Sequence, residues 1–410
     1  MRLRDRIIAA VVVSGLHLVA LGPTVGDSSV IVDPIFRPEA EAILDGSLPY
    51  SERGFEYPPL ALPLVLAPGL ISSSEAGYRA AFEWQMIGFD LAIVLLLAFA
   101  LRGPAARVLA GLGVYSVGLI ILSGIGPLPG SDIDEAPLAL ARFDLAPAAL
   151  VLAAALARQA SRSATWSALL SAGVAVKAFP VLLYPSFLRG ERHPRRVILA
   201  ALPPLAAAAA IVLVTGDEFF SAVSYHTGRE LQVETLGATP LMLAHLLGAG
   251  AATDTGAGAY NLVADGARVA RALSVGLLAS GYVFLLWQGW RRRTPPLEIA
   301  TAILAVAIVF APVLSPQFLL WVLPVSAAAY GLRIPNLLLL VAIGLTQSML
   351  SLYGGVETLS TGFVLAIAAR NAVLIAYLAS VVAAILRPRR PVPARAVSAE
   401  PHRDAVGAQA

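Results

Sequence analysis

Ionisable and aromatic side chains gather in a few short segments of an otherwise apolar chain. The first segment reads Asp33-Pro-Ile-Phe-Arg-Pro and is followed by Tyr50 and by Glu56-Tyr57-Pro-Pro. A carboxylate held beside a substrate can remove the proton from a sugar or lipid hydroxyl. Aspartate is also a common turn and cap residue. Asp33 is therefore a candidate general base, with a structural acid as the alternative.

Two further segments place charge close to apolar runs. Arg142 and Asp144 lie two residues apart, so they cannot share one face of a helix and each needs its own partner. Arg142 suits a phosphate or a carboxylate, with Asp144 orienting a neighbour, and an interfacial ion pair is the alternative. Lys177 is the only lysine in the chain. If buried it must be paired, either with an anionic phosphate or with an internal carboxylate.

The segment 225–235 reads Tyr-His-Thr-Gly-Arg-Glu-Leu-Gln-Val-Glu-Thr and is dense in hydrogen-bonding groups. His226 and Arg229 could face a phosphate, while Glu230 and Glu234 could bind sugar hydroxyls. A solvated loop is the alternative interpretation. Gln317, which follows Ser315-Pro and precedes Trp321, is a further candidate contact, and a polar turn between helices explains it as well.

Several classes of site are excluded by what the sequence lacks. It has no Gly-rich nucleotide-binding motif at a strand-to-helix turn and no His/Asp cluster with zinc spacing. It has no cysteine, which excludes disulfides, thiolate metal sites and iron–sulfur clusters. No cofactor is required by any motif, and a divalent metal is allowed but not indicated, because no acid cluster demands one.

The elements that must position these residues are membrane helices. Of the 410 residues, 58% are hydrophobic and only 13% are charged, and the mean hydropathy is +0.78. An average soluble domain has about 25% charged residues. Apolar runs of about eighteen or more residues recur, each long enough to cross a bilayer as a helix. The net charge of +3 does not indicate nucleic-acid binding, because the basic residues cluster between these runs.

The apolar runs predict about ten crossings, to which a helical hairpin over 166–188, broken at Lys177 and Pro180, adds two arms. Two further stretches, 57–72 and 237–250, are expected to be partial or surface helices. The predicted crossings lie near residues 7–24, 79–101, 107–126, 137–157, 196–215, 267–290, 296–314, 316–332, 334–353 and 360–386.

Charge predicts the orientation. With the N-terminus inside, the cytoplasmic segments hold 20 of the 29 Lys and Arg residues and only five of the 26 acids, as the positive-inside rule requires. Those segments are 1–6, 102–107, 158–163, 189–196, 291–298, Arg333 and the tail from Arg387. Both termini are then cytoplasmic. The long loops 25–56, 127–136, 216–236 and 251–266 then face outward and carry most of the remaining charge. We expect a transmembrane domain over 1–387 and a disordered tail over 388–410.

Taken together, these segments resemble the GT-C superfamily of polytopic glycosyltransferases, in particular glycosyltransferase family 87 (the DUF2029 group). The resemblance spans most of the chain and rests on the order and spacing of the motifs. Phe36 stands where the family usually has a tyrosine after the loop aspartate. The motifs are Asp33 with Tyr50 and Glu56-Tyr-Pro-Pro59, Arg142-Phe-Asp144, Lys177-Ala-Phe-Pro180, His226-Thr-Gly-Arg229 with Gln232-Val-Glu234, and Ser315-Pro-Gln317 with Trp321.

This resemblance implies a helical bundle of about 10–12 transmembrane helices in the plasma membrane, with short re-entrant or interfacial helices on its outer face. It implies an inverting transferase that moves a sugar, with mannose expected, from a polyprenyl-phosphate donor to a glycolipid or lipoglycan. Asp33 would be the base. The substrate contacts would come from Glu56, Tyr57, Arg142, Asp144, Lys177, His226, Arg229, Glu234 and Gln317.

Three other interpretations stay open at this point. A transporter or flippase would move a lipid-linked sugar without chemistry, but it needs charges along a path, and here most lie at one face with no internal repeat. A non-catalytic assembly protein would tolerate replacement of Asp33. Within the enzyme class, an arabinofuranosyl or glucosyl donor is not distinguished from mannose.

Overall fold

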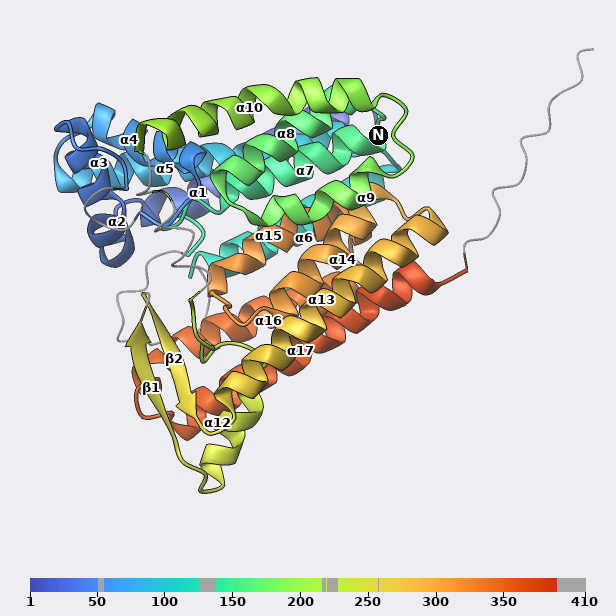
Figure 1. The fold of residues 1–410 in the computed structure, drawn as a ribbon. Coiled ribbons are helices and arrows are strands. Elements are labelled where there is room, and N and C mark those ends of the chain that lie inside the picture. Colours follow the sequence, from blue (N-terminus) through green and yellow to red (C-terminus); the bar gives the residue numbers. More distant parts are fainter. Residues whose placement is uncertain (51–54, 125–137, 216–218, 220–227, 257, 389–410) are drawn as a thin grey trace, which may run out of the picture.

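Most of the described chain is helical. The structure, a computed structural model, describes residues 1–50, 55–124, 138–215, 219, 228–256 and 258–388. The long helices lie side by side in a bundle (Figure 1). Several short helices and one β-hairpin gather at the end of the bundle away from the N-terminus. The predicted all-α membrane fold with short helices at one end is confirmed, and the β-hairpin is an addition to it.

Six described helices are long and apolar enough to cross a membrane, judged by length and composition. α10 and α13 lie on the outside of the bundle, where only 6% and 11% of their most apolar windows are buried. The six are α1 (Leu3–Leu21, continued by η1, Gly22–Thr24), α5 (Glu75–Leu95, continued by η3, Leu96–Ala100), α6 (Ala105–Leu122), α10 (Pro194–Thr215), α13 (Ala267–Arg292) and α17 (Thr361–Leu386).

The other four predicted crossings are shorter helices of 12 to 17 residues. Most side chains of α7, α14 and α15 are buried, so these helices form the centre of the bundle. That each of the four crosses the membrane stays a prediction. They are α7 (Leu145–Gln159), α14 (Pro296–Phe310), α15 (Leu319–Tyr330) and α16 (Ile334–Leu350).

The predicted helical hairpin is present. α8 (Ser163–Val176) ends at Lys177, and the chain returns through η4 (Phe179–Leu183) and α9 (Tyr184–Leu188). Arg158, at the end of α7, donates to the carbonyl oxygens of Phe187 and Arg189, both at 2.7 Å. These bonds fix the returning arm next to the end of α7. Lys177 is consequently held at the opposite end of the hairpin, beside the start of α7.

Short helices form where partial helices were expected, and also within the first predicted outer loop. α4 (Leu62–Ile71) follows η2 (Pro59–Ala61) inside the stretch 57–72, and α12 (Thr239–Leu246) lies inside 237–250. The loop 25–56 contains α2 (Ser29–Ile35) and α3 (Arg37–Leu44). Pro59 begins η2, as its fixed backbone dihedral favours.

The β-hairpin occupies the predicted loop 251–266. β1 (Ala251–Gly256) pairs with β2 (Ala259–Ala264) in antiparallel register, with Ala251 opposite Ala264. A second segment joins its other edge: Leu262 N–H donates to Leu231 O (2.8 Å), and Val233 N–H donates to Tyr260 O (3.1 Å). The hairpin therefore fixes the segment that leads to Glu234.

Candidate active site

Asp33 lies in α2, and two charged residues of α5 hold this short helix. Arg79 Nε donates to Asp33 Oδ1 (3.1 Å), Nη2 forms an ion pair with Oδ2, and Nη1 donates to Gly26 O (2.9 Å). Glu83 is buried and accepts from the backbone N–H groups of Gly26 and Ser28, where α2 begins. The Asp33 side chain is 14% exposed. The carboxylate is thus fixed in direction but reachable from outside.

Sequence reasoning missed Arg79. It stands at the first position of the predicted span 79–101, outside the predicted cytoplasmic segments that hold most of the basic residues. A cation at the predicted outer end of a span, where few basic residues are expected, was the available signal. Its acidic partner could not be identified from the sequence, because 46 residues separate Arg79 from Asp33.

An aromatic cluster connects α2 with the other predicted residues. Phe36, one turn after Asp33, lies 5.0 Å from Phe82 and 5.5 Å from Phe143, measured between ring centroids. Tyr57 lies 4.7 Å from Phe143 and 6.0 Å from Phe36. The Arg142 guanidinium is 6.0 Å from the Phe36 ring centroid, a cation–π distance. Phe36, at the position where the resembled family usually has tyrosine, makes these contacts with its aromatic ring and has no hydroxyl to form a hydrogen bond.

Tyr57 is the hydrogen-bond partner of Arg142. Arg142 Nη1 donates to the Tyr57 hydroxyl at 3.2 Å. Burial raises the pKa of Tyr57 to about 12, with Arg142 opposing this shift and Glu56 adding to it. The hydroxyl therefore stays protonated at neutral pH and keeps a proton to donate. Tyr50 fixes this segment by donating its hydroxyl to the Tyr57 carbonyl oxygen at 2.9 Å.

Lys177 forms an ion pair with Asp144, the internal-carboxylate partner that was one of its two expected partners. Lys177 Nζ lies 2.7 Å from Asp144 Oδ1, and the Trp321 indole N–H donates to the same oxygen. Four aromatic rings surround the ammonium at 5.4–5.6 Å, those of Tyr57, Phe143, Phe318 and Trp321. The partner of Lys177 within the described chain is an internal carboxylate, at a place where cation–π contacts add to the ion pair.

Arg142 and Asp144 contact different partners, as their spacing predicts. They flank Phe143 just before α7, so one short segment supplies a cation to Tyr57 and a carboxylate to Lys177. Gln317 lies in η5 (Pro316–Phe318) and is 9% exposed. It is next to Phe318, whose ring stacks on Trp321 at 3.9 Å. Gln317 therefore directly precedes, in the chain, an aromatic member of the Lys177 cluster.

Glu234 belongs to a second, buried group. Tyr353, in η6 (Tyr353–Gly355), donates its hydroxyl to Glu234 Oε1. Arg370 and Asn371 of α17 both donate to the Glu234 carbonyl oxygen. Burial raises the pKa of the Glu234 carboxyl, and the Tyr353 hydrogen bond and the Arg370 charge oppose this shift. Arg370 and Asn371 are themselves buried, as polar groups inside a membrane helix should be.

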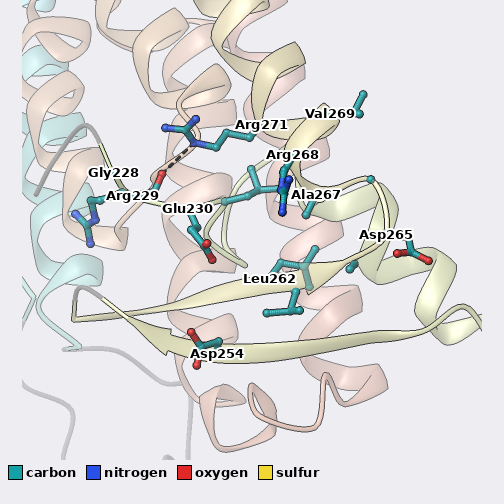
Figure 2. Close-up of a pocket in the computed structure, with 14 residues that line it drawn as sticks. Gly228, Arg229, Glu230, Asp254, Leu262, Asp265, Ala267, Arg268, Val269 and Arg271 are labelled. Carbon is teal, nitrogen blue, oxygen red and sulfur yellow. Dashed lines mark hydrogen bonds between the residues drawn. The ribbon is translucent and has the colours of Figure 1, made fainter. Parts of the chain in front are cut away.

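Arg229 lines a separate cavity of about 860 Å³ between the β-hairpin and the start of α13 (Figure 2). Its carbonyl oxygen accepts from Arg271 Nε at 2.9 Å. His226 lies outside the described residues. Gln232 connects the segment 228–235 with the loop just before η5. Its backbone N–H donates to Pro312 O (3.1 Å), and its side chain accepts from Leu314 N–H (2.8 Å).

The structure thus brings Tyr57, Arg142, Asp144 and Lys177 into one cluster with Glu56 beside it, and it joins Asp33 to this cluster through Phe36. It places Arg229 and Glu234 apart from that cluster, on a segment connected to it by Gln232. Among the described residues, no group of three or more His, Asp or Glu side chains is arranged to hold a metal ion.

Comparison with known proteins identifies the family. Residues 55–316, more than half of the chain, match the profile of glycosyltransferase family 87. The match includes Tyr57, Arg142, Asp144, Lys177 and the segment 228–235, while Asp33 precedes it and Gln317 follows it. No curated protein matches the chain. With its membrane-spanning helices and this match, the chain is a multi-pass membrane protein that belongs to glycosyltransferase family 87.

Proposed function

We propose that the protein is an inverting transferase that moves mannose from a polyprenyl-phosphate donor to a glycolipid or lipoglycan on the outer face of the plasma membrane. The observation that carries the proposal is the fixed, partly exposed carboxylate of Asp33, one turn before Phe36, whose ring packs on the cluster that contains Arg142 and Lys177. A lipid-linked donor also suits a chain whose sequence contains no nucleotide-binding motif.

In the proposed reaction, Asp33 accepts the proton of an acceptor hydroxyl. The hydroxyl oxygen attacks the anomeric carbon, and the bond from that carbon to the phosphate oxygen breaks with its electron pair leaving on polyprenyl phosphate. A carboxylate offers about four lone pairs. The two N–H donors of Arg79 therefore leave room on Asp33 for the hydroxyl while they hold the carboxylate in direction.

The leaving phosphate needs fixed positive charge. Arg142 is the better candidate for direct contact, because a guanidinium has five N–H donors and the described structure uses one, toward Tyr57. Lys177 already forms an ion pair with Asp144. It either adds positive charge near the phosphate without contacting it, or it leaves Asp144 and pairs with the phosphate when the donor binds. With these cations in place, the proposed reaction requires no divalent metal.

The first test is sugar transfer in membranes that contain wild type or Asp33→Asn at equal expression. The substrate is radiolabelled polyprenyl-phosphate-mannose, and the product is labelled endogenous glycolipid. Loss of a general base is expected to reduce the rate by about 10²- to 10⁴-fold. The matched control is Asp45→Asn, since Asp45 is an exposed acid at the end of α3 in the same loop.

Unchanged transfer by Asp33→Asn would remove Asp33 from catalysis. If wild type transfers arabinofuranose or glucose from the corresponding polyprenyl phosphate but no mannose, the proposed donor is wrong and the reaction type stands. If wild type transfers none of these sugars but moves a lipid-linked sugar across the bilayer, the proposed function is wrong.

A further inference from the structure

None of the bond-making and bond-breaking steps described above uses the cavity beside the β-hairpin, yet it is large and six of its lining residues are charged. Its volume of about 860 Å³ is at the upper end of the range usual for small-molecule sites. Its lining comes from the segment 228–231, from both strands of the hairpin and from the first turns of α13. Figure 2 shows Arg271 and Asp254 on opposite sides of it, with Arg268 and Leu262 between them.

The charged residues of the lining are three arginines and three acids. Arg229, Arg268 and Arg271 offer planar donors that suit the oxygens of a phosphate ester. The carboxylates of Glu230, Asp254 and Asp265 are acceptors that suit hydroxyl groups. A ligand with one phosphodiester and several hydroxyls matches both sets, whereas a purely anionic ligand would meet the repulsion of the acids.

One side of the cavity faces the expected membrane surface. α13 is a candidate membrane span with only 11% of its most apolar window buried, so most of that surface must face lipid. Val263 and Val269 line the cavity and are 50% and 64% exposed. Leu273, one turn below Val269 on α13, is 62% exposed. Apolar side chains thus continue from the cavity along the surface of a membrane helix.

We propose that this cavity binds the phosphodiester and polyol headgroup of a membrane lipid that enters sideways from the bilayer. The headgroup lies among the arginines and carboxylates, and the acyl chains lie along Val269 and Leu273. The cavity then receives the lipid end of the acceptor, an assignment that rests on the proposed transferase function. The segment from Arg229 to Gln232 connects it physically with the loop before η5.

The test is equilibrium binding of labelled phosphatidylglycerol to the purified full-length protein in micelles of a neutral detergent. Phosphatidylglycerol carries one phosphodiester and two hydroxyls, and phosphatidylcholine is the comparison lipid without net charge or hydroxyls. We expect phosphatidylglycerol to bind at least about tenfold more tightly, and Arg268→Gln to weaken its binding by about tenfold. Arg268→Lys, which keeps the charge, should bind more tightly than Arg268→Gln.

Arg291→Gln is the matched control, because Arg291 lies at the opposite end of α13, where its guanidinium is 5.6 Å from the Trp287 ring centroid. Equal binding of the two lipids, or wild-type binding by Arg268→Gln, would overturn the proposal. Soluble glycerophosphoglycerol that competes as well as the intact lipid would show a site for free phosphate esters and would overturn sideways entry.

Transfer kinetics separate this inference from the proposed function. If wild type transfers sugar, Arg268→Gln should raise the KM for the acceptor and leave kcat nearly unchanged. An unchanged acceptor KM would overturn the assignment to the acceptor while the transferase function stands. If wild type transfers no sugar, the transferase function fails, and the lipid-binding result still decides whether the cavity is a headgroup site.

Discussion

A carboxylate that acts as a base must be held in one direction and still keep lone pairs for its substrate. Asp33 satisfies both conditions through Arg79, whose guanidinium contacts both carboxylate oxygens and also the Gly26 carbonyl of the preceding turn. Glu83 holds the start of the same helix from one turn further along α5. At the residue scale, α5 therefore supplies the support for α2, and Arg79 is a positioning residue for Asp33.

Arg79→Gln should lower kcat for sugar transfer by about 10- to 100-fold, because a displaced base loses its alignment with the acceptor hydroxyl. The KM for the donor should change little, since Arg79 does not contact the Arg142 and Lys177 cluster in the described structure. The measurement is steady-state transfer in purified protein. Arg79→Lys, which keeps the charge but loses the planar pair of donor nitrogens, should recover part of kcat.

The matched control is Arg37→Gln. Arg37 forms an ion pair with Glu75 at 3.1 Å, and Arg79 forms one with the same residue at 3.2 Å. Arg79 also contacts Asp33, whereas Arg37 is not paired with it in the described structure. Loss of activity in both variants would indicate a general loss of structure around α3 and α5. A wild-type kcat in Arg79→Gln would show that Asp33 needs no such support and would refute the positioning role.

The residues of the cluster around Lys177 could be predicted from the sequence, but which of them pair with one another could not. Arg142, Asp144 and Lys177 stood out because charged groups next to apolar runs are costly without partners. The spacing of Arg142 and Asp144 correctly predicted separate partners. That Lys177 pairs with Asp144, 33 residues away, depends on the antiparallel packing of α7 and α8. Local sequence contains no information about which of several acids such a lysine meets.

At the scale of elements, glycines set how closely the central helices approach. A Cβ added at Gly111 of α6 would lie 3.3 Å from the backbone oxygen of Ala327 in α15. Small residues at such crossings allow helix backbones to pack closely within membranes. Arg107, one turn earlier on α6, donates to the Ala328 carbonyl oxygen at 3.1 Å. The α6–α15 contact therefore depends on a small side chain at residue 111.

Gly111→Leu should destabilise the protein by about 1–3 kcal/mol, since the added side chain meets backbone that cannot move aside locally. The thermal unfolding midpoint in detergent should fall accordingly. Gly113→Leu is a control on the same helix with the same change of volume and helix propensity. A Cβ at Gly113 meets no atom within 4 Å. Equal midpoints for the two variants would show that α6 does not need close packing at Gly111.

The helical hairpin was predictable and the β-hairpin was not, for physical reasons. Lys177 is a charged interruption of an apolar run, and Pro180 cannot continue the helix that precedes it. By contrast, β1 reads Ala-Ala-Thr-Asp-Thr-Gly, which has few of the β-branched or aromatic residues that mark a strand. β1 is stabilised by pairing with β2, and β2 pairs along its other edge with the segment 231–233. These contacts form only in the folded chain.

The whole molecule is polarised in charge. At the end of the bundle near the N-terminus, arginines donate to carbonyl oxygens at the C-terminal ends of helices, where cations are favoured by the helix dipole. Arg6 contacts the Leu101 oxygen (3.2 Å), Arg158 those of Phe187 and Arg189, and Arg292 that of Leu386 (2.7 Å). α2, which carries Asp33, and the β-hairpin, which lines the proposed lipid cavity, lie at the opposite end (Figure 1). This arrangement agrees with the sequence-based partition of charge, while the direction of the protein in the membrane stays a prediction.

Cysteine labelling tests that direction without background, because the chain contains no cysteine. Thr255→Cys places a thiol on exposed β1, and Arg192→Cys places one in the exposed loop after α9, at the other end of the bundle. A membrane-impermeant maleimide applied to intact cells should label Thr255→Cys and leave Arg192→Cys unlabelled. After permeabilisation both should react, which shows that each thiol is accessible. The reverse pattern would place Asp33 and the lipid cavity on the cytoplasmic side, where donor and acceptor would have to be lipids of the inner leaflet.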